Sequence, residues 1–263
     1  MTTQLICTTC GTYMKNGFDA AQNCPTCREE RQYVPLTGQS WTTADQLQSN
    51  HRLNIIELNP SVFELVIEPT FAIGQRAFLI RSPAGNILWD CIPLLSQEIV
   101  GFIRAAGGLK GLAFSHPHYY SNMNEWAETF NCPIFIHSSD APYIHDFGPN
   151  VQLWEGRTKS LWDDLTLQNI GGHFDGSSVL QVPSIGEKGS LFIGDTLYLS
   201  LSLTHFAAMY SYPNRIPLPI AKVQEVKARF GELDFDAIYG FYSYQNVLSG
   251  AYELVQRSLD RYI

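Results

Sequence analysis

Two histidines stand one residue apart in the segment SHPHYYS, residues 115–121, directly after the apolar run GLAF. With this spacing both imidazoles can reach one metal ion from a single loop. A third histidine, His173, lies in the glycine-rich segment IGGHFDGSS, and Asp195 ends the apolar run LFIGD. Neutral imidazoles bind zinc, and the ion lowers the pKa of its water to about 7. We therefore expect His116, His118, His173 and Asp195 to hold a metal ion with an open position for catalysis.

Four cysteines near the start form a second candidate metal site. Cys7 and Cys10 make one CxxC pair, Cys24 and Cys27 make another, and thirteen residues separate the pairs. Two such turns can complete a tetrahedron of thiolates around a structural Zn²⁺ ion. Disulfides, free thiols, a redox pair and a rubredoxin-like iron site are the alternatives. The spacing favours a zinc ribbon over residues 1–35, and the metal supplies its folding energy because about thirty residues build little core.

Charge and composition limit the partners. The net charge is −8, and residues 1–35 carry three basic and three acidic side chains, so we expect no nucleic-acid partner. We expect the ribbon to pack on the main domain or on another subunit, as in a homo-oligomer. No apolar run approaches the roughly 18 residues of a membrane span, and the start lacks the pattern of a secretory signal. These features, with paired cysteines typical of a reducing compartment, predict a cytoplasmic protein without membrane contact.

The remaining chain has the pattern of a globular α+β domain, since 45% of the residues are hydrophobic and 16% are charged. A linker, 34–47, leads into a short helix. The expected strands are 62–69, 76–83, 86–93, 110–115, 133–138, 151–156, 165–172, 177–184, 189–198 and 236–243. The expected helices are 95–108, 121–130, 141–147, 220–233 and 249–262. This order predicts two sheets packed together with helices outside.

The order of these motifs resembles the metallo-β-lactamase superfamily over roughly residues 50–263. That family has an αββα sandwich, a His-x-His-x-Asp-His motif after a strand, a later Gly-His loop, an Asp that ends a strand and a final His. His116 and His118 match the first two histidines, His173 matches the Gly-His loop, and Asp195 matches the later Asp. The resemblance implies a metallo-β-lactamase-like domain over residues 36–263.

Other stretches extend the resemblance to the whole chain. The strand NILWDC ends in Asp90, as an early strand does in the family, which implies that Asp90 orients a ligand loop rather than binding metal. The Cys-rich start, RQYVPLTGQSWTT and SYPNRIPL resemble a branch of the superfamily, found in fungi and bacteria, in which an N-terminal zinc ribbon accompanies a degenerate motif.

The sequence departs from the family motif at three positions. Tyr120 and Ser121 stand where the motif has its Asp and second His, and FYSYQN stands where the final His should be. In the family these positions serve the second metal ion. The resemblance therefore implies a single Zn²⁺ or Fe²⁺ ion held by the three retained histidines, with Asp195 as fourth ligand or as acceptor for the water.

The favoured function is a hydrolase that cleaves a small ester, lactone, thioester or amide at one metal ion. Asp195 would orient or deprotonate the water, and the Tyr120 hydroxyl would point at it. One alternative is a mononuclear iron oxygenase acting on a sulfur compound, because His116, His173 and Asp195 match its ligand triad. Another is a catalytically inactive protein that binds a small molecule or a partner, which the three lost positions favour and the retained ligands oppose.

Other residues have more ordinary interpretations. His137 and His145 are expected as surface or satisfied core residues, and Cys91 and Cys132 as buried small hydrophobes. His205 lies in a long stretch that could roof the site. The tyrosine-rich patches YSYPN and YGFYSYQN fit either a pocket wall or the core.

Overall fold

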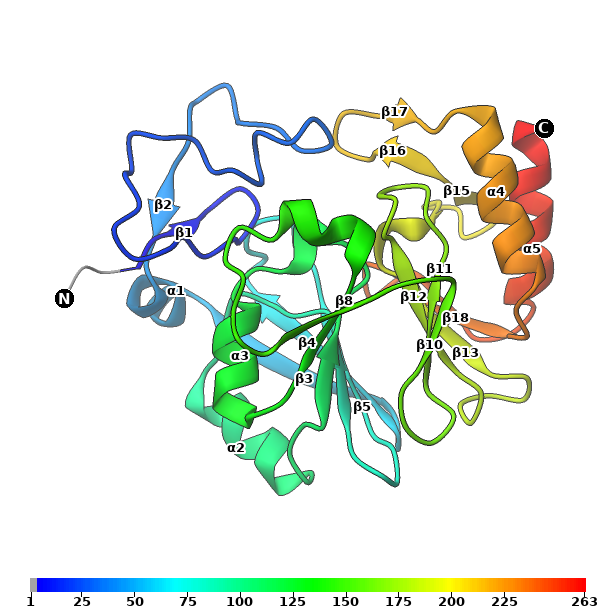
Figure 1. Cartoon of the computed structure of the whole chain (residues 1–263), viewed down its shortest axis with the longest axis horizontal. Coiled ribbons are helices and arrows are strands. Elements are labelled where there is room, and N and C mark those ends of the chain that lie inside the picture. The colour runs from blue at the N-terminus through cyan, green and yellow to red at the C-terminus, as the bar shows by residue number, and fades with distance from the viewer. Residues whose placement is uncertain (1–3) are drawn as a thin grey trace. The chain divides into compact units, whose positions relative to one another are not determined.

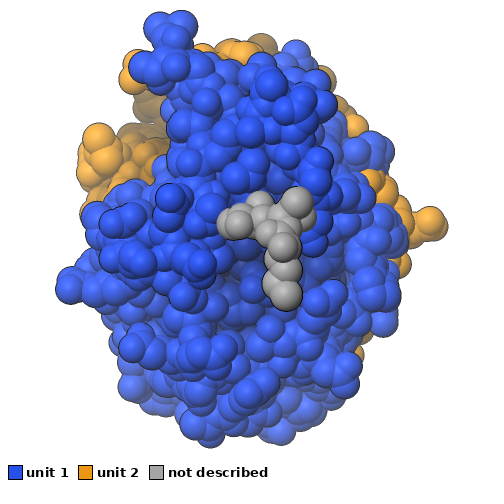
Figure 2. Space-filling view, turned by 90° about the vertical axis from the view of Figure 1, so that its left-hand side faces the viewer, with its two compact units in different colours: residues 1–135, 142–152 blue, residues 136–141, 153–263 orange. Residues whose placement is uncertain are grey.

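The computed structural model describes residues 4–263 (Figure 1). Contacts within the chain divide it into two compact units, which Figure 2 colours blue and orange. Unit 1 comprises Met1–Phe135 and Pro142–Gln152, and unit 2 comprises Ile136–Ala141 and Leu153–Ile263. The expected domain boundary after residue 35 stays a prediction.

The main sheet of unit 1 has its strands in chain order. These are β3 (Arg52–Asn59), β4 (Val62–Glu68), β5 (Ala77–Ile80), β6 (Ile87–Trp89), β7 (Gly111–Ala113), β8 (Ile134–His137) and β9 (Val151–Trp154). The strands are antiparallel from β3 to β6, and β6, β7 and β8 run parallel. β5 and β6 are buried along their whole length, as their apolar runs predict, because a strand covered on both faces has no polar side.

Two helices lie beside this sheet (Figure 1). α2 (Gln97–Ala105) begins after Ser96, whose hydroxyl oxygen accepts a hydrogen bond from the backbone N–H of Ile99 (3.4 Å). α3 (Met123–Phe130) buries Trp126, whose indole N–H donates to the carbonyl of Ile92 (3.1 Å). Both helices thereby fix the loops that follow β6 and β7.

Unit 2 has a second sheet and two helices. Its strands, in sheet order, are β10 (Thr158–Ser160), β11 (Thr166–Asn169), β12 (Ser178–Val182), β13 (Ser190–Phe192), β18 (Ala237–Tyr239) and β19 (Asn246–Val247). α4 (Ile220–Gly231) and α5 (Ala251–Leu259) pack on each other and share one buried apolar cluster with β12, β13 and β18.

The other elements of the described residues are short. They are α1 (Ala44–Asn50), η1 (Pro117–Tyr119), η2 (Ser138–Tyr143), η3 (Gly194–Thr196), η4 (Asp260–Tyr262), and the strand pairs β1 (Ile6–Cys7) with β2 (Trp41–Thr42), β14 (Tyr198–Leu199) with β15 (Phe206–Ala207), and β16 (Met209–Ser211) with β17 (Ile216–Pro217). Within residues 4–263, every helix falls short of the length and apolar character that crossing a membrane requires.

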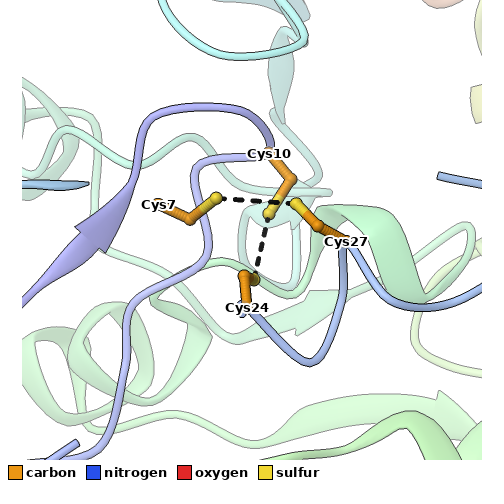
Figure 3. Close-up of side chains that lie close together, drawn as sticks. All are labelled: Cys7, Cys10, Cys24 and Cys27. Carbon is orange, nitrogen blue, oxygen red and sulfur yellow. Dashed lines mark hydrogen bonds between the residues drawn. The ribbon is translucent and has the colours of Figure 1, made fainter. Parts of the chain in front are cut away.

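The Cys-rich segment, residues 4–42, brings its four cysteines together (Figure 3). The sulfur atoms of Cys7 and Cys27 lie 3.5 Å apart, and those of Cys10 and Cys24 lie 3.6 Å apart. Four thiolates bound tetrahedrally at about 2.3 Å from one zinc ion stand about 3.8 Å from one another. The cluster therefore has the donors and the spacing of a metal site, while the identity of the ion as zinc stays a prediction.

The surroundings of Cys7 favour its thiolate form. Gln39 donates its side-chain N–H to the Cys7 sulfur (3.0 Å). Hydrogen bonds from Cys10, Cys24 and Cys27 lower the pKa of the Cys7 thiol despite its burial, and the thiolate is the form that binds a metal. Only a small apolar cluster within residues 4–42 surrounds these sulfurs, so a bound ion would contribute much of the folding free energy.

The Cys-rich segment docks on loops of its own unit. Tyr13 donates its hydroxyl hydrogen to the Pro93 carbonyl (3.0 Å), and Ser121 donates its hydroxyl hydrogen to the Gly11 carbonyl (2.7 Å). Gly11 has φ +78°, and a Cβ there would lie 3.0 Å from the Pro93 ring, so both conformation and close approach favour glycine. The segment therefore packs on the rest of the chain, which is one of the two placements expected from sequence.

The first prediction concerns the cysteine cluster. Cys24→Ser should remove the bound ion and open residues 4–42 locally, because the segment has little other core. Limited trypsin digestion followed by mass spectrometry should then show rapid cleavage at Lys15, Arg28 and Arg31, with the two sheets still protected. Cys132→Ala, which removes a buried thiol outside the cluster, is the control. Equal protection of both variants would contradict a structural metal here.

A second prediction concerns a buried ion pair. Glu64 of β4 and Arg76 are 2.8 Å apart, and both side chains are 1% exposed. Glu64→Ala should lower the free energy of unfolding by about 3–5 kcal/mol, because it removes the carboxylate from a buried guanidinium. Arg52 forms an exposed pair with Glu68 at 3.2 Å, and Arg52→Ala should cost less than about 1 kcal/mol. Urea unfolding of both variants measures the difference, and similar losses would refute the assignment.

Candidate metal centre

His116 lies at the end of β7 with a fixed ring orientation. Ser115 donates both its backbone N–H (2.8 Å) and its hydroxyl hydrogen (2.9 Å) to the Asp90 carboxylate. The Ser115 oxygen lies 2.9 Å from Nδ1 of His116. Because the hydroxyl hydrogen goes to Asp90, the oxygen accepts the N–H of Nδ1, and Nε2 keeps its lone pair. Asp90 thus orients the ligand loop, as its sequence position predicts.

His118 sits in η1 and is buried. Its Nε2 atom lies 3.8 Å from a carboxylate oxygen of Glu29. Burial lowers the pKa of His118 below its ordinary value, even though the nearby Glu29 carboxylate acts in the opposite direction. The ring is therefore neutral at neutral pH, which is the form that binds a metal.

Glu29 reaches His118 from the Cys-rich segment, two residues after Cys27. One carboxylate oxygen accepts the backbone N–H of Arg31 (2.9 Å), and the other pairs with the Arg31 guanidinium. Burial opposes ionisation, but His118 and Arg31 outweigh it and hold the pKa of Glu29 below its ordinary value. No sequence pattern predicts this contact, because a glutamate after a CxxC pair is typical of an exposed loop.

The two motif positions that depart from the family pattern also lie against this segment. Ser121, at φ +36°, bonds to Gly11 as described above. Tyr120 packs its ring edge on Phe114 (5.4 Å between centroids) and lines a cavity of about 330 Å³ that Tyr13 also lines. The expected role of the Tyr120 hydroxyl in orienting water stays a prediction.

His173 and Asp195 form a second pair of expected ligands, within unit 2. Asp195 lies in η3, directly after β13, with its side chain 14% exposed. Nε2 of the buried His173 lies 4.0 Å from a carboxylate oxygen of Asp195, and Nδ1 lies 3.3 Å from the Met209 carbonyl. A Cβ on Gly172 would lie 2.8 Å from Val226 of α4, so glycine lets the loop carrying His173 pack tightly on that helix.

The four expected ligands thus form two pairs, one in each unit, and each residue offers one nitrogen or oxygen atom to a metal. The separation of 4.0 Å between His173 and Asp195 exceeds a hydrogen bond. It also exceeds about 3.4 Å, the spacing of two ligands bound tetrahedrally at about 2.1 Å from one zinc ion. Binding of one ion by this pair therefore requires a small movement that brings the two atoms closer.

Tyrosines surround the Asp195 carboxylate in unit 2. The Tyr212 ring lies 5.6 Å from the His173 ring and 5.3 Å from the Tyr198 ring. Burial, together with the Asp195 charge, raises the pKa of Tyr242 to about 12 and that of Tyr212 well above its ordinary value. These tyrosines, from the patches that sequence left unassigned, are protonated side chains beside Asp195.

The other histidines have local partners. Nε2 of His137 lies 3.0 Å from the Gly156 carbonyl, and its ring packs on Trp154. This is the satisfied core role expected from sequence. Burial lowers the pKa of His145, and His145 lines the same cavity as Tyr120. His205 bonds to the Thr204 hydroxyl (3.0 Å).

No protein-family model matches the sequence, but a known bacterial protein is similar to it along nearly its whole length. The chain is 40% identical to "Uncharacterized protein YmaE" of Bacillus subtilis (strain 168) over 261 residues, which cover 98% of this chain and 95% of that protein.

Solved structures show the fold. The metallo-β-lactamase DIM-1 superposes with a TM-score of 0.59 at 15% identity, covering 80% of this chain and 98% of that one. The metallo-β-lactamase FIM-1 from Pseudomonas aeruginosa, in its mono-zinc form, gives 0.57 at 15% identity, covering 80% and 95%. The expected metallo-β-lactamase-like α+β fold is confirmed. The chain therefore belongs to the same family as YmaE, and its fold is that of the metallo-β-lactamases.

Proposed function

We propose that the protein hydrolyses a small ester, lactone, thioester or amide with one metal ion held by His116, His118, His173 and Asp195. The observation that carries the proposal is the preset orientation of the ligand rings. Ser115 fixes His116 with the Nε2 lone pair available, and the Met209 carbonyl lies beside Nδ1 of His173. Ring fixation of this kind is typical of metal-binding histidines.

A single ion suits the residues that the chain retains. The positions that serve a second ion in the superfamily hold Tyr120, Ser121 and the stretch FYSYQN. The FIM-1 structure in its mono-zinc form supports the compatibility of one zinc ion with this fold. The lowered pKa of His118, and the placement of His173 beside Asp195, are the features of this chain that suit a metal.

Each residue then has a definite task. A bound ion would supply a Lewis acid and a water of lowered pKa. Asp195, whose carboxylate is partly exposed beside His173, would be either the fourth ligand of the ion or the acceptor that orients and deprotonates that water. Tyr212 donates its hydroxyl hydrogen to the Ala207 carbonyl (3.1 Å), so it contributes a fixed ring wall. The hydroxyls of Tyr198 and Tyr244 are hydrogen-bonded to each other at 2.7 Å, so the pair would offer one remaining donor to an oxygen of a polar substrate.

The first test is metal content. Elemental mass spectrometry should find about two ions per chain, one at the cysteines and one at the histidines. The double variant His116→Ala/His118→Ala should lose about one ion per chain and keep the cysteine-bound one. The control is His137→Gln, because His137 has its own partners away from these ligands. A wild-type chain with only the cysteine-bound ion would refute the metalloenzyme and leave the inactive binding protein.

The identity of the second ion separates the two enzyme classes. Zinc supports the hydrolase. If the second ion is iron and the protein consumes oxygen in the presence of thiols or persulfides, the protein is a mononuclear oxygenase instead of a hydrolase. Two histidines and a carboxylate also suit iron.

The second test concerns Asp195. Asp195→Asn should lower the hydrolysis rate about a hundredfold or more, since an amide is a poor proton acceptor and a weak ligand. A panel of esters, lactones, thioesters and amides gives the measurement. Asp175→Asn, an exposed change in the segment that carries His173, should leave the rate within about twofold. Equal rates for the two variants would remove Asp195 from the mechanism.

A further inference from the structure

The Cys-rich segment places one carboxylate beside a metal-ligand histidine. Glu29 lies two residues after Cys27 and is held by Arg31 on both carboxylate oxygens. Its side chain is 15% exposed, and that of His118 is 3% exposed. The contact therefore lies in a mostly dry environment, where charges act more strongly than in water.

The charge on Glu29 distinguishes the two nitrogens of His118. Nε2 faces the carboxylate at 3.8 Å. A nitrogen lone pair in that position would be repelled by the negative charge, whereas an N–H dipole would be attracted. A neutral imidazole carries its hydrogen on one nitrogen only. The carboxylate therefore favours the hydrogen on Nε2 and leaves the lone pair on Nδ1.

The rings of His116 and His173 also have an oxygen beside one of their nitrogens. Nδ1 of His116 faces the Ser115 oxygen, and Nδ1 of His173 faces the Met209 carbonyl. In these two rings an oxygen within hydrogen-bond distance favours the hydrogen on Nδ1 and leaves Nε2 for a metal. In His118 the Glu29 oxygen lies 3.8 Å from Nε2, so its influence is electrostatic. For His118 the oxygen comes from the Cys-rich segment, about ninety residues earlier in the chain.

We propose that Glu29 is a positioning residue of the metal centre, which fixes His118 with hydrogen on Nε2 and presents Nδ1 to the metal. The proposal rests on the proposed metal site at His116, His118, His173 and Asp195. It assigns a role to the Cys-rich segment, because the turn that carries Cys27 also carries Glu29.

The test uses the full chain and Zn²⁺ in competition with a chromophoric chelator. Glu29→Ala should weaken Zn²⁺ binding at the histidine site about 10–100-fold, the usual cost of removing an outer carboxylate. Zn²⁺ binding at the cysteines and the thermal midpoint of the apoprotein's main transition should not change. Glu30→Ala removes the same charge from the exposed neighbouring residue and should leave both Zn²⁺ affinities unchanged.

A second measurement needs no variant. Long-range ¹H–¹⁵N NMR of the Zn²⁺-loaded wild type should show His118 with hydrogen on Nε2 and metal on Nδ1. Metal on Nε2, or unchanged affinity in Glu29→Ala beside a working histidine site, overturns the role of Glu29 and leaves the proposed function standing. A wild type that binds Zn²⁺ only at its cysteines overturns the proposed function itself, and this inference with it.

Discussion

A buried imidazole binds a metal only if its ring is held with the lone pair in the right direction. Rotation of a free ring would cost affinity each time the metal binds. In this protein each expected histidine ligand has an oxygen beside one nitrogen: Ser115 for His116, the Met209 carbonyl for His173, and Glu29 for His118. The Asp90 carboxylate adds a further link by fixing Ser115. The residues that orient the rings are therefore as important for metal binding as the histidines themselves.

Two of the positions that depart from the family motif, Tyr120 and Ser121, lie beside the Cys-rich segment. Ser121 stands where the family has a metal-binding histidine, and its hydroxyl bonds to Gly11 of the Cys-rich segment. Tyr120 stands where the motif has an aspartate and lines a cavity together with Tyr13. Ser121 therefore contacts the Cys-rich segment, and Tyr120 shares a cavity with it.

The fold of the Cys-rich segment depends more on its cysteine cluster than on buried apolar side chains. Its cysteines lie close enough to share one ion, and the apolar side chains around them are few. Its contacts with the rest of unit 1 include hydrogen bonds at Tyr13 and Gly11 and an exposed ion pair between Lys15 and Asp146. Each such bond contributes only about 1 kcal/mol. The segment therefore holds its place beside His118 only while its own fold is maintained.

The sequence by itself determined the elements and the ligand types. Apolar runs and capping residues predicted strands such as β5 and helices such as α2, because local periodicity reflects burial. Periodicity did not predict β3, because its residues do not alternate clearly between buried and exposed. It also did not predict the short pairs β14–β15 and β16–β17. Motif spacing predicted Asp195 and the three histidines as ligands, since each follows a strand or a glycine turn.

Only the tertiary structure brought Glu29 to His118 and Tyr212 to His173, because contacts between residues far apart in the chain leave no local pattern. The ring orientations were decided there as well, since an imidazole's tautomer depends on the oxygen that lies beside it.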